Sequence, residues 1–403
     1  MTLSAASRIH TLVGEILAPG RPSLPDLNPS EWDALWRYAR THGLTPYLHQ
    51  RWQEAGVLTR LPPDVARTYA QARALNEQRN IRILRELEEI CGSLQEQGIT
   101  PQVLKGLPLS QTYYGDPSLR LLYDVDLLIR EPDGPRALRR LRQMGYEPFP
   151  ALSRARDESL GLLWRPKEYA WDAERVFDPE RPLFVELHTR PWQPRWHGFR
   201  VECDLDFWDG LHVEKIGGVE LTVPSEESHL VQLAVHYAFN ALESNARLMH
   251  LLDVALLLRR RGAQLDWNRT LRQIEANRAA PFCFLTLELA RRICRSEIPD
   301  HLRRALRART PERIVLWLET EGVQAAHTMN LYERDRNRIY FLHWAIASGW
   351  SEKLPVLWYS LVSPWHEGSG FGRLISFTRR MAQRTRHLLA SFADRGGHRM
   401  LHK

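Results

Sequence analysis

The sequence has few of the features that mark secreted, membrane-spanning or cysteine-ligated metal proteins. Its 403 residues include only four cysteines (Cys91, Cys203, Cys283 and Cys294), and no two of them form a CxxC or other metal-ligand spacing. Residues 1–20 hold no apolar core like that of a signal peptide, and charge interrupts the longest apolar runs elsewhere. No internal repeat or low-complexity segment is present. We therefore expect a reduced, cytoplasmic protein without a transmembrane helix.

Most of the chain also lacks an excess of positive charge. The formal net charge is +7, but residues 373–403 alone contain seven Arg and one Lys against one Asp. The remainder is close to neutral, so a general nucleic-acid-binding surface is not expected. The basic tail is amphipathic in its first turns. That pattern is compatible with an acidic partner or an anionic membrane surface, but it is more often that of a solvated or disordered chain end.

What the sequence does contain is a change of pattern that divides it into four regions. Helical periodicity dominates the start, and its longest run extends from Pro63 to a stop at Gly98. Short strands and loops follow, and then helices again. We expect an α+β fold in which a small mixed sheet is flanked by N-terminal helices and a C-terminal helical domain. The predicted regions are 1–97 (helical), 98–223 (sheet core), 224–362 (helical domain) and 363–403 (linker and basic tail).

The elements expected after residue 98 follow from apolar runs and from the turn residues that bound them. A Gly217-Gly218 hairpin turn is expected just before the last strand. The predicted strands cover 99–104, 120–129, 168–171, 183–188 and 219–223. The predicted helices cover 107–114, 135–144, 226–242, 245–261, 268–277, 280–294 and most of 311–361.

The strand over 120–129 carries two carboxylates on one face. Because strand side chains alternate, Asp124 and Asp126 share a face with Leu128, opposite an apolar face of Val125, Leu127 and Ile129. Carboxylates at i and i+2 lie roughly 7 Å apart, where their repulsion is on the order of 2 kcal/mol at an effective dielectric of about 20. A cation bound between them would relieve this repulsion, and so would a proton shared by the two carboxylates or water at a solvated strand end.

Other polar residues lie in apolar segments, where a polar side chain needs a partner or a function. Glu186 and His188 share one face of the strand over 183–188, and Glu168 and Asp172 are alternative acids on a less apolar segment. Asp253 interrupts an apolar helical run and needs a partner, for which Arg247 or His250 would be within helical reach. A structural ion pair and a substrate contact are both open for Asp253.

Several short motifs, taken in order, resemble a known family. They are Leu104-Lys105-Gly106, Arg120, Asp124-Val125-Asp126, Glu186-Leu187-His188, His236 and the Arg247…Asp253 pair. Over about residues 99–260 the chain is similar to the uncharacterised bacterial nucleotidyltransferases of the polymerase-beta-like superfamily, found among polysaccharide and peptide-tailoring genes. The resemblance implies a small nucleotidyltransferase sheet as the core.

The resemblance also implies an activity and roles for these residues. The expected reaction moves a nucleoside monophosphate from an NTP to a small-molecule, sugar or peptide acceptor and releases pyrophosphate, with Mg²⁺ or alternatively Mn²⁺. Asp124, Asp126 and Glu186 would hold the metal and carry catalysis, and Lys105, Gly106 and Arg120 would bind the nucleotide. The remaining motif residues, which are His188, His236, Arg247 and Asp253, would support the ligands or face the acceptor. A phosphotransferase on the same fold and a non-catalytic nucleotide-binding scaffold are the alternatives.

Overall fold

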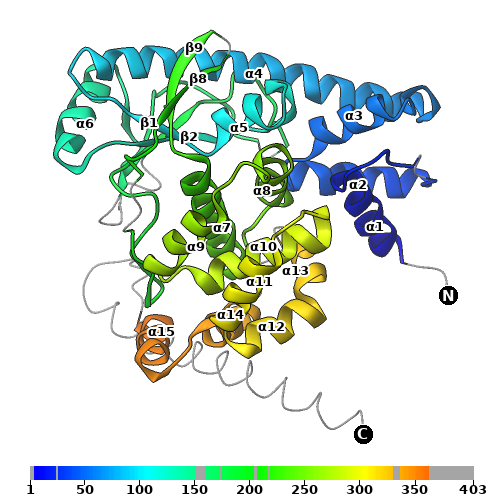
Figure 1. Cartoon of the computed structure of the whole chain (residues 1–403). Coiled ribbons are helices and arrows are strands. Elements are labelled where there is room, and N and C mark those ends of the chain that lie inside the picture. Colours follow the sequence, from blue (N-terminus) through cyan, green and yellow to red (C-terminus); the bar gives the residue numbers. More distant parts are fainter. Residues whose placement is uncertain are drawn as a thin grey trace, which may run out of the picture.

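The computed structural model describes residues 4–23, 26–149, 159–172, 174–203, 207–216, 218–329 and 336–362. Its fold is α+β, as the sequence predicts: a mixed sheet lies between one long helix and a larger set of helices (Figure 1). No helix in the described part of the chain is long and apolar enough to cross a membrane. The predicted linker and basic tail over 363–403 lie outside the described residues.

Four helices precede the sheet, and the last is the longest in the structure. Its buried side chains recur every three or four residues, which gives it one continuous packing face. It ends at the predicted stop, where Gly98 has φ +70° and the Ile99 amide donates to the Leu94 carbonyl. The elements are α1 (Ala5–Leu17), α2 (Pro29–Thr41), α3 (Thr45–Glu54), η1 (Leu58–Arg60) and α4 (Pro63–Gln95).

The sheet has seven strands in the order β3-β4-β5-β2-β1-β9-β8. β2 pairs parallel with β5 and antiparallel with β1, so the sheet is mixed. A separate hairpin is formed by β6 (Arg195–Trp196) and β7 (Phe199–Arg200). The strands of the main sheet are β1 (Gln102–Leu104), β2 (Asp124–Leu128), β3 (Glu147–Pro148), β4 (Ser159–Trp164), β5 (Phe184–His188), β8 (His212–Ile216) and β9 (Val219–Val223).

Short helices connect these strands, and longer ones follow the sheet. Ser225 caps the first long helix by accepting from the Ser228 amide, as its position in the sequence predicts. The connecting helices are α5 (Gly106–Thr112), η2 (Pro117–Leu119), η3 (Glu131–Asp133) and α6 (Gly134–Gln143). The later ones are α7 (Glu226–Leu242), α8 (Leu248–Arg261), α9 (Trp267–Ala276), α10 (Ala280–Cys294), α11 (Asp300–Ala308), α12 (Glu312–Trp317), the π-helical η5 (Leu318–Gly322), α13 (Val323–Thr328), α14 (Arg336–Ile346) and α15 (Trp350–Val362).

The two faces of β2 belong to different cores, as the alternation in the sequence predicts. Val125, Leu127 and Ile129 pack with α4 and α6 in one cluster, whereas Leu128 joins the cluster built mainly by the other helices. Figure 1 shows α4 on one side of the sheet and α7 to α13 on the other. The carboxylate face of β2 is therefore turned toward α7 and α8.

The cores cross the predicted domain boundaries. The second half of α4 packs on the sheet, and α1 to α3 share a core with α7 to α13. These shared cores do not test the predicted division into four regions, so that division stays a prediction.

Three predicted strands differ from the structure by more than one residue. The strand predicted over 99–104 is β1, which begins only at Gln102. Residues 168–171 form no strand; β4 instead pairs with β5, and Trp171 stacks on Phe184 with a centroid distance of 5.8 Å. Pro166 lies between β4 and that segment, and because it has no amide hydrogen it cannot donate a strand hydrogen bond. β2 begins at Asp124 and not at residue 120. Side chains of α4 donate hydrogen bonds to the backbone carbonyls just before Asp124, so these carbonyls do not join the strand pairing.

Candidate active site

The register between β2 and β5 brings the predicted acids together. Asp126 pairs with Glu186, and Leu128 pairs with His188. Parallel pairing of the two strands therefore places Asp126, Glu186 and His188 on one face, with one potential ligand atom from each within 4.8 Å of the others. The rival acids Glu168 and Asp172 are exposed and lie outside this group.

Asp126 is the most enclosed member of the group. Its Oδ1 accepts from Lys105 Nζ at 2.8 Å and contacts His188 Nε2 at 2.9 Å, and only 4% of the residue is exposed. Glu186 Oε2 lies 3.5 Å from the same His188 nitrogen. His188 thus bridges the two carboxylates and fixes their relative orientation.

Each of these charged groups stabilises the ionised form of its neighbours. Burial alone would raise the pKa of Asp126, but Lys105 and His188 hold it well below its usual range. Burial alone would lower the pKa of His188, but its hydrogen bonds to Asp126 and Glu186 raise it to about 9. His188 is therefore protonated near neutral pH when no cation is bound. Lys105 and His188 then balance two of the three negative charges.

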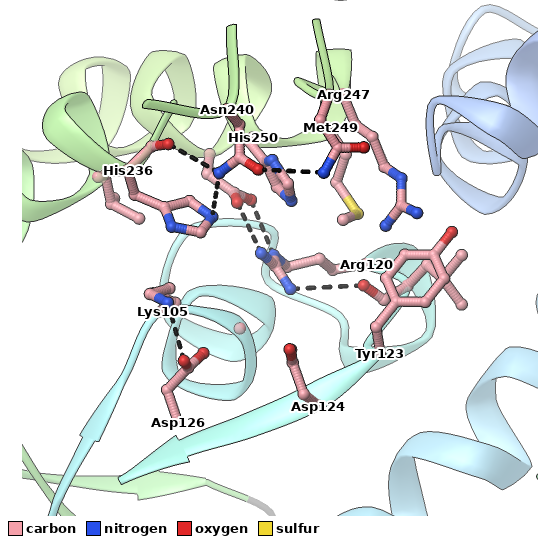
Figure 2. A pocket seen from close by; sticks show the side chains of 15 residues that line it. Lys105, Arg120, Tyr123, Asp124, Asp126, His236, Asn240, Arg247, Met249 and His250 are labelled. Atoms are coloured by element: carbon pink, nitrogen blue, oxygen red, sulfur yellow. Dashed lines mark hydrogen bonds and ion pairs between the residues drawn. The ribbon is translucent and has the colours of Figure 1, made fainter. Parts of the chain in front are cut away.

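Asp124 is in a different situation. Among the described residues it has no hydrogen-bond or ion-pair partner, and Figure 2 shows it beside Asp126 at the floor of a pocket. Burial and the charge of Asp126 raise the pKa of Asp124 to about 6. A partly buried carboxylate beside a second one, without a partner of its own, is suited to receive a cation.

The turn between β1 and α5 brings Lys105 to the carboxylates. Lys105 adopts φ 51° and ψ −136°, which is an uncommon conformation for a residue with a side chain. Backbone strain of this kind concentrates at functional sites, where surrounding structure enforces it. The next residue, Gly106, approaches its neighbours closely, since a Cβ there would lie 3.0 Å from Leu122 Cδ2 and 3.2 Å from Arg120 Nη1.

Arg120 is held by α8 through a buried ion pair. Its Nε and Nη2 donate to the two oxygens of Asp253 at 2.8 and 2.7 Å, and the Tyr114 hydroxyl also donates to Asp253. The expectation that Arg247 or His250 would pair with Asp253 is therefore wrong. Arg247 lies six residues before Asp253, which puts it on a different side of an α-helix.

Three polar residues of α4 hold the segment that leads into β2. Asn76 donates to the carbonyls of Ser118 and Arg120, and Asn80 donates to the carbonyls of Pro117 and Arg120. Arg79 donates to the Leu122 carbonyl. These bonds fix the backbone that presents Arg120 and Asp124.

A pocket separates the carboxylates from α7 and α8. We call its far side the helical wall; Leu233, His236, Asn240, Asn245, Arg247, Met249, His250 and Asp253 form it. Figure 2 shows this wall facing Lys105, Arg120, Asp124 and Asp126 across the pocket. Burial and nearby positive charge lower the pKa of His236 and His250 well below the usual value, so both are neutral. Apart from Asp253, which is paired with Arg120, the wall thus offers neutral hydrogen-bonding groups and one arginine.

The pocket gathers most of the residues that the sequence singled out. Lys105, Gly106, Arg120, Asp124, Asp126, His236, Arg247 and Asp253 all line it, while Glu186 and His188 adjoin it through Asp126. Sequence reasoning missed Tyr123, Asn240, Asn245 and Met249 in the lining, and the three polar residues of α4. The α4 residues had a signal, because Asn76, Arg79 and Asn80 interrupt a helical stripe that is otherwise apolar.

The donor set can be tested against the metal that the resemblance implies. Mg²⁺ binds carboxylate oxygens in preference to nitrogen and retains several waters. Asp126 and Glu186 offer such oxygens close to one another, and Asp124, on the same face of β2, has a carboxylate with no described partner to displace. These residues fit the ion, with His188 orienting two of them.

The fold and this centre define an α+β protein whose sheet presents acids able to hold a divalent cation beside a pocket. A family model described as "Uncharacterised nucleotidyltransferase" matches residues 28–295, which is more than half of the chain. The chain belongs to this family, and its membership supports nucleotidyl transfer as the general activity, with an NTP as substrate. Comparisons with curated proteins and with solved structures gave no match.

Proposed function

We propose that the protein is a Mg²⁺-dependent nucleotidyltransferase that moves a nucleoside monophosphate from an NTP to a hydroxyl-bearing small molecule, sugar or peptide. The observation that carries this proposal is the convergence of Asp124, Asp126 and Glu186 on one sheet face, beside a pocket lined by Lys105 and Arg120. Family membership supports the same reaction class. No disulfide joins the four cysteines in the described part of the chain, and this supports the cytoplasmic location that we propose.

In this proposal Asp124, Asp126 and Glu186 hold the metal. Bound Mg²⁺ would stabilise the negative charge that grows on the phosphate oxygens during displacement of pyrophosphate. Gly106 would act in nucleotide binding by letting Arg120 lie close to the backbone of the turn, because a side chain at residue 106 would meet Leu122 and Arg120.

The other polar residues around the pocket have roles in orientation and proton transfer. Glu186 takes the proton of the acceptor hydroxyl, and His188 keeps Glu186 and Asp126 in register by bridging them. On the helical wall, the Asn240 side-chain amide donates to the His236 carbonyl at 2.8 Å, and the Asn240 side-chain oxygen accepts from the Asn245 amide at 3.5 Å. Neutral imidazole and carboxamide groups of this kind bind hydroxyls and nucleobases rather than strongly charged groups.

The decisive experiment measures pyrophosphate release by Asp126→Asn. Each of ATP, GTP, CTP and UTP is labelled and incubated with Mg²⁺ and an extract of the native host, and the products are identified by mass spectrometry. We expect Asp126→Asn to lose pyrophosphate release at least a hundredfold while circular dichroism shows an intact fold. EDTA should abolish release by the wild-type protein, and added Mg²⁺ should restore it.

The matched control is Glu168→Gln, which removes an exposed acid from outside the site and should leave turnover unchanged. Unchanged turnover in Asp126→Asn would end the proposal. Accumulation of ADP in place of pyrophosphate would identify a phosphotransferase. Calorimetry that detects no Mg²⁺-dependent NTP binding would favour a non-catalytic scaffold.

A further inference from the structure

Arg247 is the pocket arginine without a carboxylate partner. Lys105 is paired with Asp126, and Arg120 is paired with Asp253. With the residues that the structure describes, the Arg247 guanidinium forms no hydrogen bond or ion pair, only its stacking contact with Tyr123. The pocket therefore contains one cation whose donors are available to a ligand.

The position of Arg247 is set by aromatic stacking. Its guanidinium carbon lies 3.9 Å from the centroid of the Tyr123 ring, which holds it over the residue just before Asp124. Figure 2 shows the Arg247 side chain reaching from the helical wall to the Tyr123 ring, near Arg120. Stacking occupies one face of the guanidinium and leaves its edge, where the N–H groups lie, for hydrogen bonds.

Arg247 also stands where an arginine is locally unfavourable. It is the N-cap residue of α8 and makes no side-chain cap, although the positive end of a helix dipole disfavours a cation. The first amides of α8 are capped from another helix: Leu248 N donates to His42 Nδ1 at 3.3 Å, and Met249 N donates to the His42 carbonyl at 3.2 Å. Because these two amides already have acceptors, an anion near this end of α8 would bind the Arg247 side chain and not the helix N-terminus.

His42 is suited to this capping role. It is fully buried at the end of α2, and its Nε2 contacts the His327 carbonyl at 3.2 Å, which leaves Nδ1 as the acceptor for Leu248. Burial lowers the pKa of His42 to about 3, so the ring is neutral and Nδ1 keeps its lone pair. His42 therefore fixes the backbone from which Arg247 extends.

We propose that Arg247 binds the polyphosphate chain of the nucleotide, and that His42 and Tyr123 are positioning residues for it. Guanidinium edges match phosphate oxygens in geometry and charge. Tyr123 and Asp124 are adjacent, so their Cα atoms are about 3.8 Å apart. A nucleotide whose α-phosphate lies at the carboxylates would hence bring its outer phosphates within reach of Arg247. The identity of the ligand as a nucleotide rests on the proposed function.

The test measures binding of inorganic tripolyphosphate to the full-length protein by calorimetry in the presence of Mg²⁺. We expect Arg247→Ala to weaken binding about ten- to a hundredfold, because one charged hydrogen-bonding partner is lost. Arg247→Lys keeps the charge without the paired donors and should give an intermediate loss. The control is Arg260→Ala, an exposed arginine of the same helix, which should bind like the wild type.

The positioning residues are tested by conservative and non-conservative pairs. Tyr123→Phe keeps the ring and should retain tripolyphosphate affinity, whereas Tyr123→Leu should lose it in part. His42→Asn supplies another acceptor for the Leu248 amide and should restore the affinity that His42→Ala loses. In turnover assays, both disruptive variants should raise KM for the NTP more than they lower kcat. If the rescue variants behave like the disruptive ones, the positioning role is wrong.

Two results would overturn the inference about Arg247 itself. One is equal tripolyphosphate affinity in the wild type and in Arg247→Ala, and the other is no binding by the wild type. The proposed function fails differently: the wild type would then bind tripolyphosphate through Arg247 yet release no pyrophosphate from any NTP. Thermal unfolding of each variant separates a lost contact from a lost fold.

Discussion

The guanidinium of Arg120 and the carboxylate of Asp253 are joined by two hydrogen bonds, although 133 residues separate them. Both residues are almost fully buried, with 5% and 1% exposed. Burial would lower the pKa of Arg120, but the paired carboxylate raises it, so the arginine stays charged. This contact links the segment before β2 to α8, and so joins the two sides of the pocket.

Breaking this pair on one side should be costly. Asp253→Asn keeps the shape of the side chain but leaves a buried guanidinium without a counter-charge. We expect the free energy of unfolding to fall by about 3–5 kcal/mol, measured by urea denaturation. The comparison variant is Arg307→Ala, whose partner Glu312 is exposed, and it should change stability by about 1 kcal/mol or less. Equal small changes in both variants would contradict a structural role for the Arg120–Asp253 pair.

His188 should make stability depend on pH when no metal is bound. Its folded-state pKa is raised to about 9 from an ordinary value near 6.5, so the folded protein binds the proton more tightly than the unfolded chain does. The resulting stabilisation is complete below pH 6.5 and is lost as the pH rises toward 9. It is on the order of 3 kcal/mol, from about 1.4 kcal/mol per pKa unit.

Urea unfolding in EDTA at pH 6, 7, 8 and 9 measures this loss. In His188→Gln most of the decline should disappear. His212 donates a hydrogen bond to Glu214 that raises its pKa, so it contributes in the same direction; His212→Gln is the control and should remove a smaller part. Mg²⁺ should flatten the wild-type curve, because the metal replaces the positive charge of the imidazolium. An identical slope in His188→Gln and in the wild type would exclude this role.

Elements governed by local periodicity could be predicted from the sequence. The bounds of α7 and α10 are those predicted, and β2 divides its side chains between two cores as its alternation requires. The more apolar strand favours Glu186 over Glu168 as the third acid, and the register places Glu186 beside Asp126. In each case the deciding signal lies within a few neighbouring residues.

Contacts between distant segments could not be predicted in the same way. The partner of Asp253 was sought on its own helix, whereas the structure supplies Arg120 from the far side of the pocket. β2 begins later than its apolar pattern predicts because carbonyls before it bond to Asn76 and Asn80; the sequence marks these asparagines as interruptions of an apolar stripe but does not show which carbonyls they bind. Local patterns specify the elements, but tertiary hydrogen bonds decide where some of them begin.

The α4 asparagines offer a direct test of that conclusion. Asn76→Leu preserves the approximate size of the side chain but removes the donor to the Ser118 and Arg120 carbonyls. Leaving these buried carbonyls with fewer partners should lower the free energy of unfolding by about 1–3 kcal/mol and weaken Mg²⁺-dependent NTP binding. Gln78→Ala, on the exposed face of the same helix, should affect neither property. Normal NTP affinity in Asn76→Leu would separate the β2 segment from the site.

Gly106 and Gly92 form a pair of glycines for which alanine should have opposite effects. At Gly106 a Cβ would lie 3.0 Å from Leu122 Cδ2 and 3.2 Å from Arg120 Nη1, so Gly106→Ala must displace side chains at the pocket. It should cost about 1–3 kcal/mol of stability and raise KM for the NTP. At Gly92, inside α4, nothing lies within 4 Å of the added Cβ, and alanine should stabilise the helix by about 0.5–1 kcal/mol. Thermal unfolding and NTP titration of both variants measure these effects. A gain of stability and an unchanged KM in Gly106→Ala would show that the close approach at residue 106 is not required by the pocket.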